Sequence, residues 1–496
     1  MKRTLQAPLA KRRNHVVSIE ADDETMHFTV IDAQTQRPID EPTAFKCGKS
    51  FIAGIESLIT KQTKAVILNI FHFKNHGFDS NYQFCQVIRE NLNRLQIPHH
   101  FISIGDTVFI TTVTEQLDLY LISEFENTET GYERLKDHHV PISGATRDKI
   151  FANKNPAKII GFDIHPSVIN GLQKLLKCDN LVILDGDYYL NANFKFICEI
   201  AKWVKNKSSN KFYVAPMTTM QYTLVGFVGD IQFELHTVDG GEKLPLTKTV
   251  AIPKTVQNYN IMIKGKEGIK ILETNQLNKE CHKNGITLKI DEEYFCSVLT
   301  TKILIPEILA LPKTLYKIQQ SKIPVIGFWD NSSVICVSKN GGNYKFLEQW
   351  NGLFGKEIFL NFNKERPTLD GTSLASNEAK MDTVVFDILK IMAMPDNNIK
   401  VDEKWKFIFT KDADHPVLLE FKTFDGTKKQ ASPAFLMAIL LRKQFEAIKK
   451  EFREKPKQVG FCFFDKFDED ERKRVGEKLQ EFCQRLKFRC TFIKLD

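Results

Sequence analysis

Several features that define common protein classes are missing from this sequence. Ten cysteines are present, but no two of them form a CxxC pair, so neither zinc ligands nor a disulfide framework is indicated. No apolar run reaches the roughly eighteen residues of a membrane-spanning helix, and we expect no membrane partner. The start, MKRTLQAPLAKRRN, is basic but lacks the apolar core of a secretory signal peptide. We interpret residues 1–13 as a basic tail, with a nuclear signal or a mitochondrial presequence left open.

Charge of one sign is not concentrated anywhere either. The formal net charge is +8 over 496 residues, and no single stripe gathers it. This mild excess permits contact with nucleic acid without arguing for it, so a nucleic-acid partner is not expected. Several cysteines sit in apolar patterns and are interpreted as reduced core thiols. That interpretation favours a cytoplasmic location, with the nucleus as the alternative.

The hydrophobic pattern changes twice along the chain. Residues 14–205 alternate apolar strand patterns with helical ones, which is typical of an α/β domain. The polar stretch 206–212 is a plausible linker, and 213–300 has short strands between Gly, Asn and Asp turns, as in an all-β sandwich or barrel. A connector over 301–322 contains too many prolines for a helical bundle. The α/β pattern resumes over 323–496.

The chain closes with a strand–helix–strand pattern. KQVGFCFFDKF predicts a buried strand from Val459 to Phe464, and a strand from Arg489 to Ile493 follows the intervening helix. A long helix from Ser432 to Phe452, with Pro433 in its first turn, leads into this unit.

Three regions of the chain carry a family resemblance. PVIGFWDNSSVICV, with Gly327, Cys336 and Val337 in register, resembles the first phosphate hairpin of the 70-kDa heat-shock chaperones of the DnaK type. IEADDETMHFTVI is similar to that family's second phosphate hairpin, and IIGFDIHPSVINGLQKLL to its adenosine loop. NYNIMIKGKE and ITLKIDEEYFCSV resemble strands of its substrate-binding sandwich. By this resemblance 14–205 corresponds to lobe II of the nucleotide-binding domain, 213–300 to the sandwich, and 323–496 to lobe I.

The resemblance implies a fold in which actin-like ATPase (RNase H-like) lobes flank a β-sandwich. The order of the parts is that of a circular permutation. We therefore expect Ile323–Asp496 to pack on His15–Lys205 around a central cleft. The alternative is that the chain is a window from a tandem array, with an unpaired half-domain at each end.

The implied nucleotide site departs from the family pattern. Asp22, Asp23 and Glu24 stand where the family has three glycines, and Trp329 replaces its metal-associated aspartate. A carboxylate about 4 Å from a phosphate charge costs on the order of 4 kcal/mol at an effective dielectric near 20. We therefore expect an inactive pseudo-ATPase without a cofactor, with ATP and magnesium as the alternative. The remnant nucleotide-site residues implied by the resemblance are Gly327, Ser332, Ser333, Thr25 and Gly161.

The acidic turn also permits a second interpretation. Asp22, Asp23 and Glu24 could offer oxygen ligands to a divalent metal, as in a metal-dependent nuclease or nucleic-acid binder. A solvated turn is the interpretation we favour.

The remaining functional expectation is a binding site for protein segments in the sandwich. In the family this domain holds extended apolar segments between its strand-connecting loops. The corresponding positions are Val228, Ile231, Phe233, Val256 and Ile261. They are either ligand contacts or ordinary core residues of the sandwich. The function expected is binding of unfolded or partner protein segments without an ATP cycle, and the alternative is an ATP-dependent folding chaperone with an unusual site.

Overall fold

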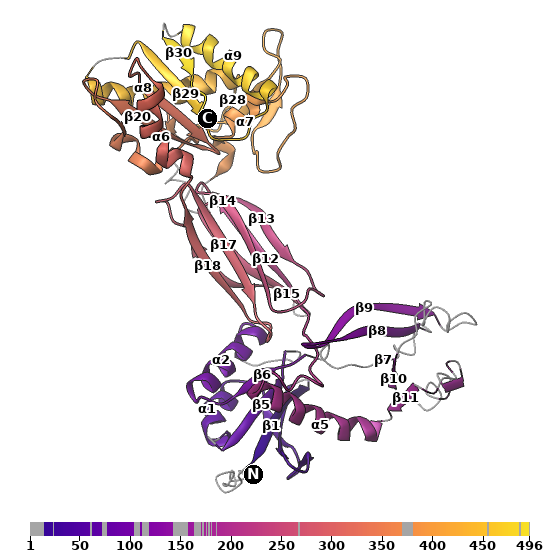
Figure 1. Ribbon diagram of the computed structural model, residues 1–496. Coiled ribbons are helices and arrows are strands. Elements are labelled where there is room, and N and C mark those ends of the chain that lie inside the picture. The colour runs from indigo at the N-terminus through magenta and orange to yellow at the C-terminus, as the bar shows by residue number, and fades with distance from the viewer. Residues whose placement is uncertain are drawn as a thin grey trace.

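The protein is an elongated molecule of three parts (Figure 1). The computed structural model describes residues 14–495 except 23, 60–61, 72–76, 104–109, 112–118, 142–156, 163–169, 171–172, 175, 177–178, 180, 185, 266–267, 370–379, 454–455 and 486–487. An N-terminal lobe and a C-terminal lobe lie at opposite ends of a central β-sandwich (Figure 1). Mixed α/β lobes and an all-β centre agree with the pattern expected from the sequence.

A six-stranded sheet forms the body of the N-terminal lobe. Its order is β3-β2-β1-β5-β6, with β4 pairing β2. β1 and β2 form an antiparallel hairpin, whereas β5 lies parallel to β1 and β6 parallel to β5. The bounds are β1 (His15–Asp22), β2 (Thr25–Asp32), β3 (Arg37–Pro38), β4 (Thr43–Lys46), β5 (Thr63–Asn69) and β6 (His99–Phe101).

Helices cover this sheet. α1 (Lys49–Leu58) and α2 (Asn81–Arg94) bury apolar residues against it, and α2 begins where the Ser80 hydroxyl accepts the Gln83 N–H at 3.2 Å. α5 (Gly186–Lys205) packs near β1, β5 and β6. The other described strands of the lobe are a parallel group, β7 (Ile110–Thr111), β10 (Ile159–Phe162) and β11 (Leu181–Leu184), and a hairpin, β8 (Leu119–Thr128) and β9 (Gly131–Pro141).

Seven strands form the central sandwich. The first sheet has the order β13-β12-β15-β16 and the second β14-β17-β18, and all neighbours within them are antiparallel. Tyr222, Ile261 and Ile286 lie in the core between the sheets. The bounds are β12 (Gln221–Val228), β13 (Ile231–Val238), β14 (Leu246–Pro253), β15 (Asn258–Gly265), β16 (Gly268–Gln276), β17 (Lys283–Ile290) and β18 (Cys296–Ile303).

The C-terminal lobe is built on a second six-stranded sheet. Its order is β21-β20-β19-β29-β30, with β22 pairing β20. β19 and β20 form an antiparallel hairpin, and β29 lies parallel to β19. The bounds are β19 (Val325–Trp329), β20 (Ser332–Ser338), β21 (Tyr344–Phe346), β22 (Lys356–Glu357), β29 (Gln458–Phe463) and β30 (Arg489–Phe492).

Helices and two small sheets complete this lobe. The helices are α6 (Pro306–Ile318), α7 (Ile388–Ala393), α8 (Pro433–Phe452) and α9 (Glu469–Arg485), with short 3-10 turns η3 (Glu348–Trp350), η4 (Gly352–Phe354) and η6 (Met381–Thr383). One small sheet has the order β24-β23-β25 and the other β26-β27-β28. Their strands are β23 (Leu360–Asn361), β24 (Thr368–Leu369), β25 (Val384–Val385), β26 (Ile408–Thr410), β27 (Leu418–Lys422) and β28 (Lys428–Ala431).

The two lobes share one strand arrangement. In each, a hairpin lies in the middle of the sheet and two later strands continue the sheet in parallel from the first strand of the hairpin. The strands after the hairpin are joined by a helix in both lobes, α2 in one and α9 in the other. The sequence stretches that predicted a phosphate hairpin therefore occupy equivalent places in two similar sheets.

The expectation that the two lobes pack on each other within one chain is wrong. The N-terminal lobe contacts one end of β17, at Asp291, and the C-terminal lobe the other end, at Lys283. Asp291 follows Lys283 by eight positions along this strand, which corresponds to about 25 Å. Apolar side chains at both ends of the sandwich join the lobes to it in one continuous core. The expected pairing of the lobes rested on the family resemblance alone. In the structure the contacts with the sandwich hold the two lobes apart (Figure 1).

Within the described part of the chain, every helix is too short or too polar to cross a membrane.

Candidate functional site

Side chains of the C-terminal lobe itself pack closely around its β19–β20 hairpin. A Cβ added to Gly327 would lie 2.7 Å from Cε2 of Phe464 and 3.2 Å from Sγ of Cys462. Glycine is needed there because neighbouring side chains fill the space above the strand. Ser333 is buried, and its hydroxyl accepts the Trp350 indole N–H at 3.0 Å and the Gln444 amide at 2.8 Å. Ser332 is buried too.

Trp329 occupies the end of this hairpin and is 1% exposed. Its indole Nε1 donates to the His282 carbonyl oxygen at 3.3 Å, across the boundary with the sandwich. A Cβ on Gly355 would lie 2.7 Å from the Trp329 ring, and the Lys254 ammonium donates to the Gly355 carbonyl at 2.9 Å. The hairpin tip therefore faces the sandwich and is covered by it.

His282 fixes the same boundary with both ring nitrogens. Its Nδ1 accepts the Ile305 N–H at 2.8 Å, and its Nε2 lies 2.9 Å from the Leu353 carbonyl oxygen, to which it donates. Burial lowers the pKa of this imidazole, although the bond to Leu353 opposes the shift. A neutral histidine with this tautomer matches both partners.

The residues expected from the N-terminal hairpin lie in the other lobe. Thr25 pairs with Asp22 across the turn, Asp22 is exposed, and Asp23 lies outside the described residues. Gly161 lies in β10 between Ile110 and Ile183. The structure therefore does not bring Thr25 and Gly161 together with Gly327, Ser332 and Ser333. Across the described ranges no three His, Cys, Asp or Glu side chains are grouped so as to hold a metal ion.

Four of the five sandwich positions do come together. Val228, Ile231, Phe233 and Val256 line one wall of a cavity of about 350 Å³ between the sandwich and the C-terminal lobe, which we call the junction cleft. The fifth, Ile261, is 1% exposed and belongs to the core between the sheets.

The opposite wall of the junction cleft comes from the C-terminal lobe and was not anticipated from the sequence. It combines Phe359, Phe386, Leu389 and Phe467 with the acidic residues Asp330, Asp387, Asp402 and Asp465. Asp330, Asp387 and Asp465 follow or precede different elements that are far apart in sequence, so no local motif connects them. Only the fold places them on one wall.

Hydrogen bonds organise the acidic wall. The Asp330 N–H donates to Oδ1 of Asp465 at 2.9 Å, and Lys283 from the sandwich approaches Oδ2 of Asp330 at 3.4 Å. Burial, together with the negative charges of Asp330 and Asp387, raises the pKa of Asp465 to about 6, although the Asp330 N–H and Lys283 act in the opposite direction. Burial also raises the pKa of Asp330. Lys283 thus partly compensates the two carboxyl groups of Asp330 and Asp465.

A larger groove adjoins the junction cleft. It has a volume of about 820 Å³ and runs over the outer face of the first sandwich sheet, beneath residues 401–406 of the C-terminal lobe. Ile231, Phe233, Asp402 and Lys404 line both cavities. The Lys404 ammonium lies 4.3 Å above the Phe233 ring, where cleft and groove meet. At the sheet edge, Ile269 and Ile271 of β16 are 59% and 58% exposed.

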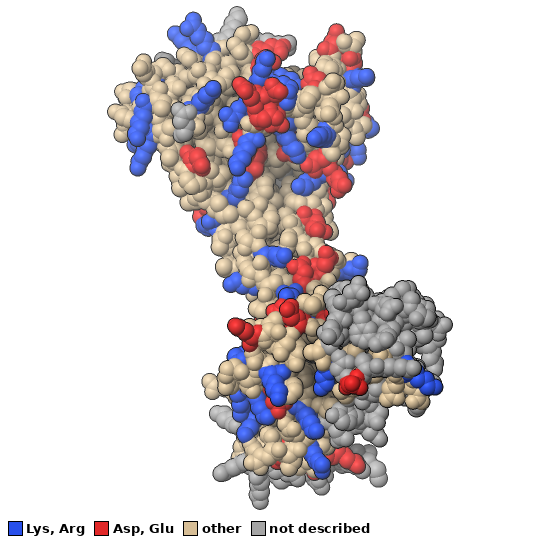
Figure 2. All heavy atoms as spheres, turned by 45° about the vertical axis from the view of Figure 1, so that its right-hand side comes forward, with Lys and Arg blue, Asp and Glu red and all other residues tan. Residues whose placement is uncertain are grey.

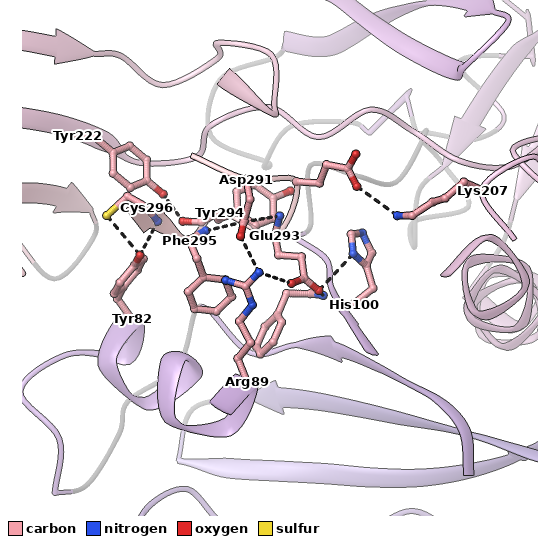
Figure 3. Close-up of polar contacts among 12 residues, drawn as sticks. Tyr82, Arg89, His100, Lys207, Tyr222, Asp291, Glu293, Tyr294, Phe295 and Cys296 are labelled. Carbon is pink, nitrogen blue, oxygen red and sulfur yellow. Dashed lines mark hydrogen bonds and ion pairs between the residues drawn. The ribbon is translucent and has the colours of Figure 1, made fainter. Parts of the chain in front are cut away.

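Polar contacts join the sandwich to the N-terminal lobe (Figure 3). Arg89 of α2 pairs with Asp291 at 2.6 Å and with Glu293 at 3.0 Å, and its guanidinium lies 4.4 Å above the Phe295 ring. His100 approaches Glu293 at 3.4 Å. The Tyr82 hydroxyl accepts the Cys296 N–H at 2.7 Å. These bonds anchor the lobe to the sandwich. A cavity of about 730 Å³ lies beside them, and Arg89, His100 and Glu293 line it.

Surface charge does not single out another site on the face shown in Figure 2. Lysine, arginine and acidic residues are intermixed over the C-terminal lobe, and uncharged residues cover much of the sandwich there. This mixture lacks the one-sided basic surface typical of nucleic-acid binding.

No protein-family model matches this chain, and no curated protein is similar to it at a significant level.

Proposed function

We propose that this protein binds extended apolar segments of other proteins in the junction cleft and the adjoining groove, without a nucleotide cycle. The observation that carries the proposal is the cleft itself. It gathers Val228, Ile231, Phe233 and Val256 on one wall, and these are the positions expected to contact a segment. A cavity of this size that sets an apolar wall opposite polar and charged groups lies within the range of ligand sites.

The geometry suits a chain in extended conformation. An apolar side chain of the segment would enter the junction cleft between Phe233 and the aromatic residues of the C-terminal lobe. The backbone would continue through the groove toward β16, which pairs only with β15 among the described strands. A free strand edge offers backbone groups to an added strand, and exposed Ile269 and Ile271 offer apolar contact there.

We further propose that the chain is a divergent, rearranged relative of the 70-kDa heat-shock chaperones. The shared strand arrangement of the two lobes supports actin-like lobes, and the seven-stranded sandwich supports the substrate-binding-like domain. Fold resemblance alone does not fix function, so the site carries the functional proposal.

The packing of the hairpins supports nucleotide independence. Trp329 and the side chains around Gly327 fill the space beside the C-terminal hairpin, and the residues expected to complete the site lie in the other lobe. An ATP-dependent chaperone with an unusual site, and a metal-dependent nuclease, remain the alternatives, and neither has a specific observation in its favour.

Fluorescence anisotropy with a labelled, neutral, leucine-rich peptide of about seven residues tests the proposal. Such a peptide spans about 23 Å when extended. We expect saturable binding that Phe233→Ala weakens about five- to tenfold, because truncation removes an apolar wall of the cleft. Leu299→Ala is the matched control, since Leu299 is 55% exposed on β18 of the other sheet. Equal affinities for the two variants would count against the cleft.

A further inference from the structure

Asp465 has an unusual position in the junction cleft. It follows the last residue of β29 by two positions and lines the cleft opposite the apolar sandwich wall. Its carboxylate holds the backbone of Asp330 through the 2.9 Å bond from the Asp330 N–H. A segment that fills the cleft would therefore lie against a carboxyl group that is already largely removed from water.

We propose that binding of an apolar segment in the junction cleft is coupled to uptake of a proton by Asp465, so that mildly acidic solution strengthens binding. Because the coupling needs an occupant in the cleft, it rests on the proposed function. It adds a regulatory property of the same site.

The charged groups nearest Asp465 lie at the ends of three elements. Asp330 directly follows β19, Asp387 precedes α7, and Lys283 begins β17. Both carboxylate oxygens of Asp387 are used, one by the Asn331 amide and one by the Trp405 indole. Farther along the wall, Asp402 pairs with Lys390 at 2.9 Å, and Lys404 lies over Phe233. Lys283 is thus the cation that faces the Asp330–Asp465 pair from the sandwich, and it approaches Asp330.

The direction of the coupling follows from desolvation. An apolar occupant displaces water from the cleft, which disfavours the charged form of a buried carboxyl group. The pKa of Asp465 is already about 6 in the free protein, so the occupant favours the protonated form and raises this pKa further. By linkage, protonation then favours the occupant. His282 is adjacent to Lys283, but its ring nitrogens bond to Ile305 and Leu353, away from the carboxyl pair.

The magnitude can be bounded. If only the protonated form bound the segment, a pKa of about 6 would give a roughly 25-fold gain in affinity between pH 7.5 and pH 5.5. Since the charged form also retains some affinity, we expect a gain of about tenfold.

The test uses the same labelled leucine-rich peptide, which has no titratable group, with the full-length protein at pH 7.5 and pH 5.5. Asp465→Asn keeps an oxygen that can accept the Asp330 N–H. It should bind at both pH values with the affinity of the wild type at pH 5.5. Asp330→Asn removes a neighbouring negative charge and should shift the transition to lower pH. Asp330 has a φ of 44°, a conformation that asparagine also adopts. Asp414→Asn, at an exposed position, is the control and should behave as the wild type.

The outcomes separate the two proposals. Absence of peptide binding by the wild type at both pH values would overturn the proposed function and the coupling together. Binding with equal affinity at both pH values would overturn the coupling and leave the proposed function intact. A pH dependence that persists in Asp465→Asn would show that another group takes up the proton, and would overturn the assignment to Asp465.

Discussion

The indole Nε1 of Trp329 donates to the backbone carbonyl of His282 over 3.3 Å, and this bond joins the C-terminal lobe to the end of the sandwich. The His282 and Trp329 rings also meet edge to face, with centroids 5.3 Å apart. A position that the family resemblance assigns to nucleotide chemistry is therefore occupied by an architectural contact.

Trp329→Ala should loosen this boundary strongly. Removing a fully buried tryptophan typically costs about 3–5 kcal/mol, because a cavity remains. Hydrogen–deuterium exchange should show faster exchange in β19, β20 and the start of β17, with the N-terminal lobe unchanged. Phe435→Ala is the control, because Phe435 is 60% exposed. Similar protection of β19 in both variants would show that Trp329 does not hold the boundary.

Arg89→Met tests the joint at the opposite end. The change keeps an apolar stem over Phe295 but removes the ion pairs with Asp291 and Glu293. Loss of one partner from a partly buried network should cost about 1–3 kcal/mol. Hydrogen–deuterium exchange of the backbone amides in α2 and in the Asp291–Phe295 turn measures this loss. Arg94→Met removes an exposed ion pair with Glu56 and should cost less than about 1 kcal/mol. Equal effects would argue that the joint depends on apolar packing alone.

The two ends of the sandwich should respond oppositely to acid. Burial raises the pKa of Glu293, but the hydrogen bond from His100 and the charges of His100, His99 and Arg89 outweigh it and lower the net value. A lowered folded-state pKa adds stability that is present above the unfolded-state value of about 4.5 and is lost as pH falls through the folded-state value. Exchange at the N-terminal joint should therefore rise below about pH 4.5. Glu293→Gln should remove this dependence, and an unchanged acid response in that variant would contradict the assignment.

The effect of pH on the stability contributed by Asp465 has the opposite sign. Its folded-state pKa of about 6 lies above the ordinary 3.8, so its stabilising contribution is full at low pH and is lost as pH rises through about 6. Compared with the wild type, Asp465→Asn should stabilise the C-terminal lobe by about 2 kcal/mol at pH 7.5 and by little at pH 4. Urea unfolding of both proteins at the two pH values measures the difference. A variant that is less stable at pH 7.5 would show that the charged carboxylate is favourable.

ATP with magnesium should not raise the melting temperature at millimolar concentration. A ligand that binds only the native state at a hundred times its dissociation constant adds about 2.7 kcal/mol, which thermal unfolding would detect. The reason for the expectation is the packed hairpin around Gly327 and Trp329. A clear shift that EDTA abolishes would place the ATP-dependent alternative first.

Local sequence patterns located most of the elements. The helix predicted from Ser432 to Phe452 is α8 (Pro433–Phe452), and the strand predicted from Val459 to Phe464 is β29 (Gln458–Phe463). These succeeded because apolar periodicity, a serine N-cap and a first-turn proline are local signals. The placement of the lobes is not local, because it depends on how the ends of β17 pack against Trp329 and Arg89.

Only one of the two walls of the candidate site could be predicted from the sequence. Val228, Ile231, Phe233 and Val256 were expected from the part of the family resemblance that covers the sandwich. Asp465 could not be found, because its properties depend on Asp330 and Asp387, which lie more than seventy residues away in the chain and meet it only in the folded lobe.

Photo-crosslinking with mass spectrometry tests the central claim most directly. The labelled leucine-rich peptide, carrying a benzophenone at its middle residue, is bound to the full-length protein and irradiated. We predict crosslinks to the cleft wall around Phe233 and Val256 and to residues 401–406. At a subsaturating peptide concentration these crosslinks should be weaker in Phe233→Ala. Crosslinks confined to the N-terminal lobe, or spread over the surface without saturation, would contradict binding in the junction cleft.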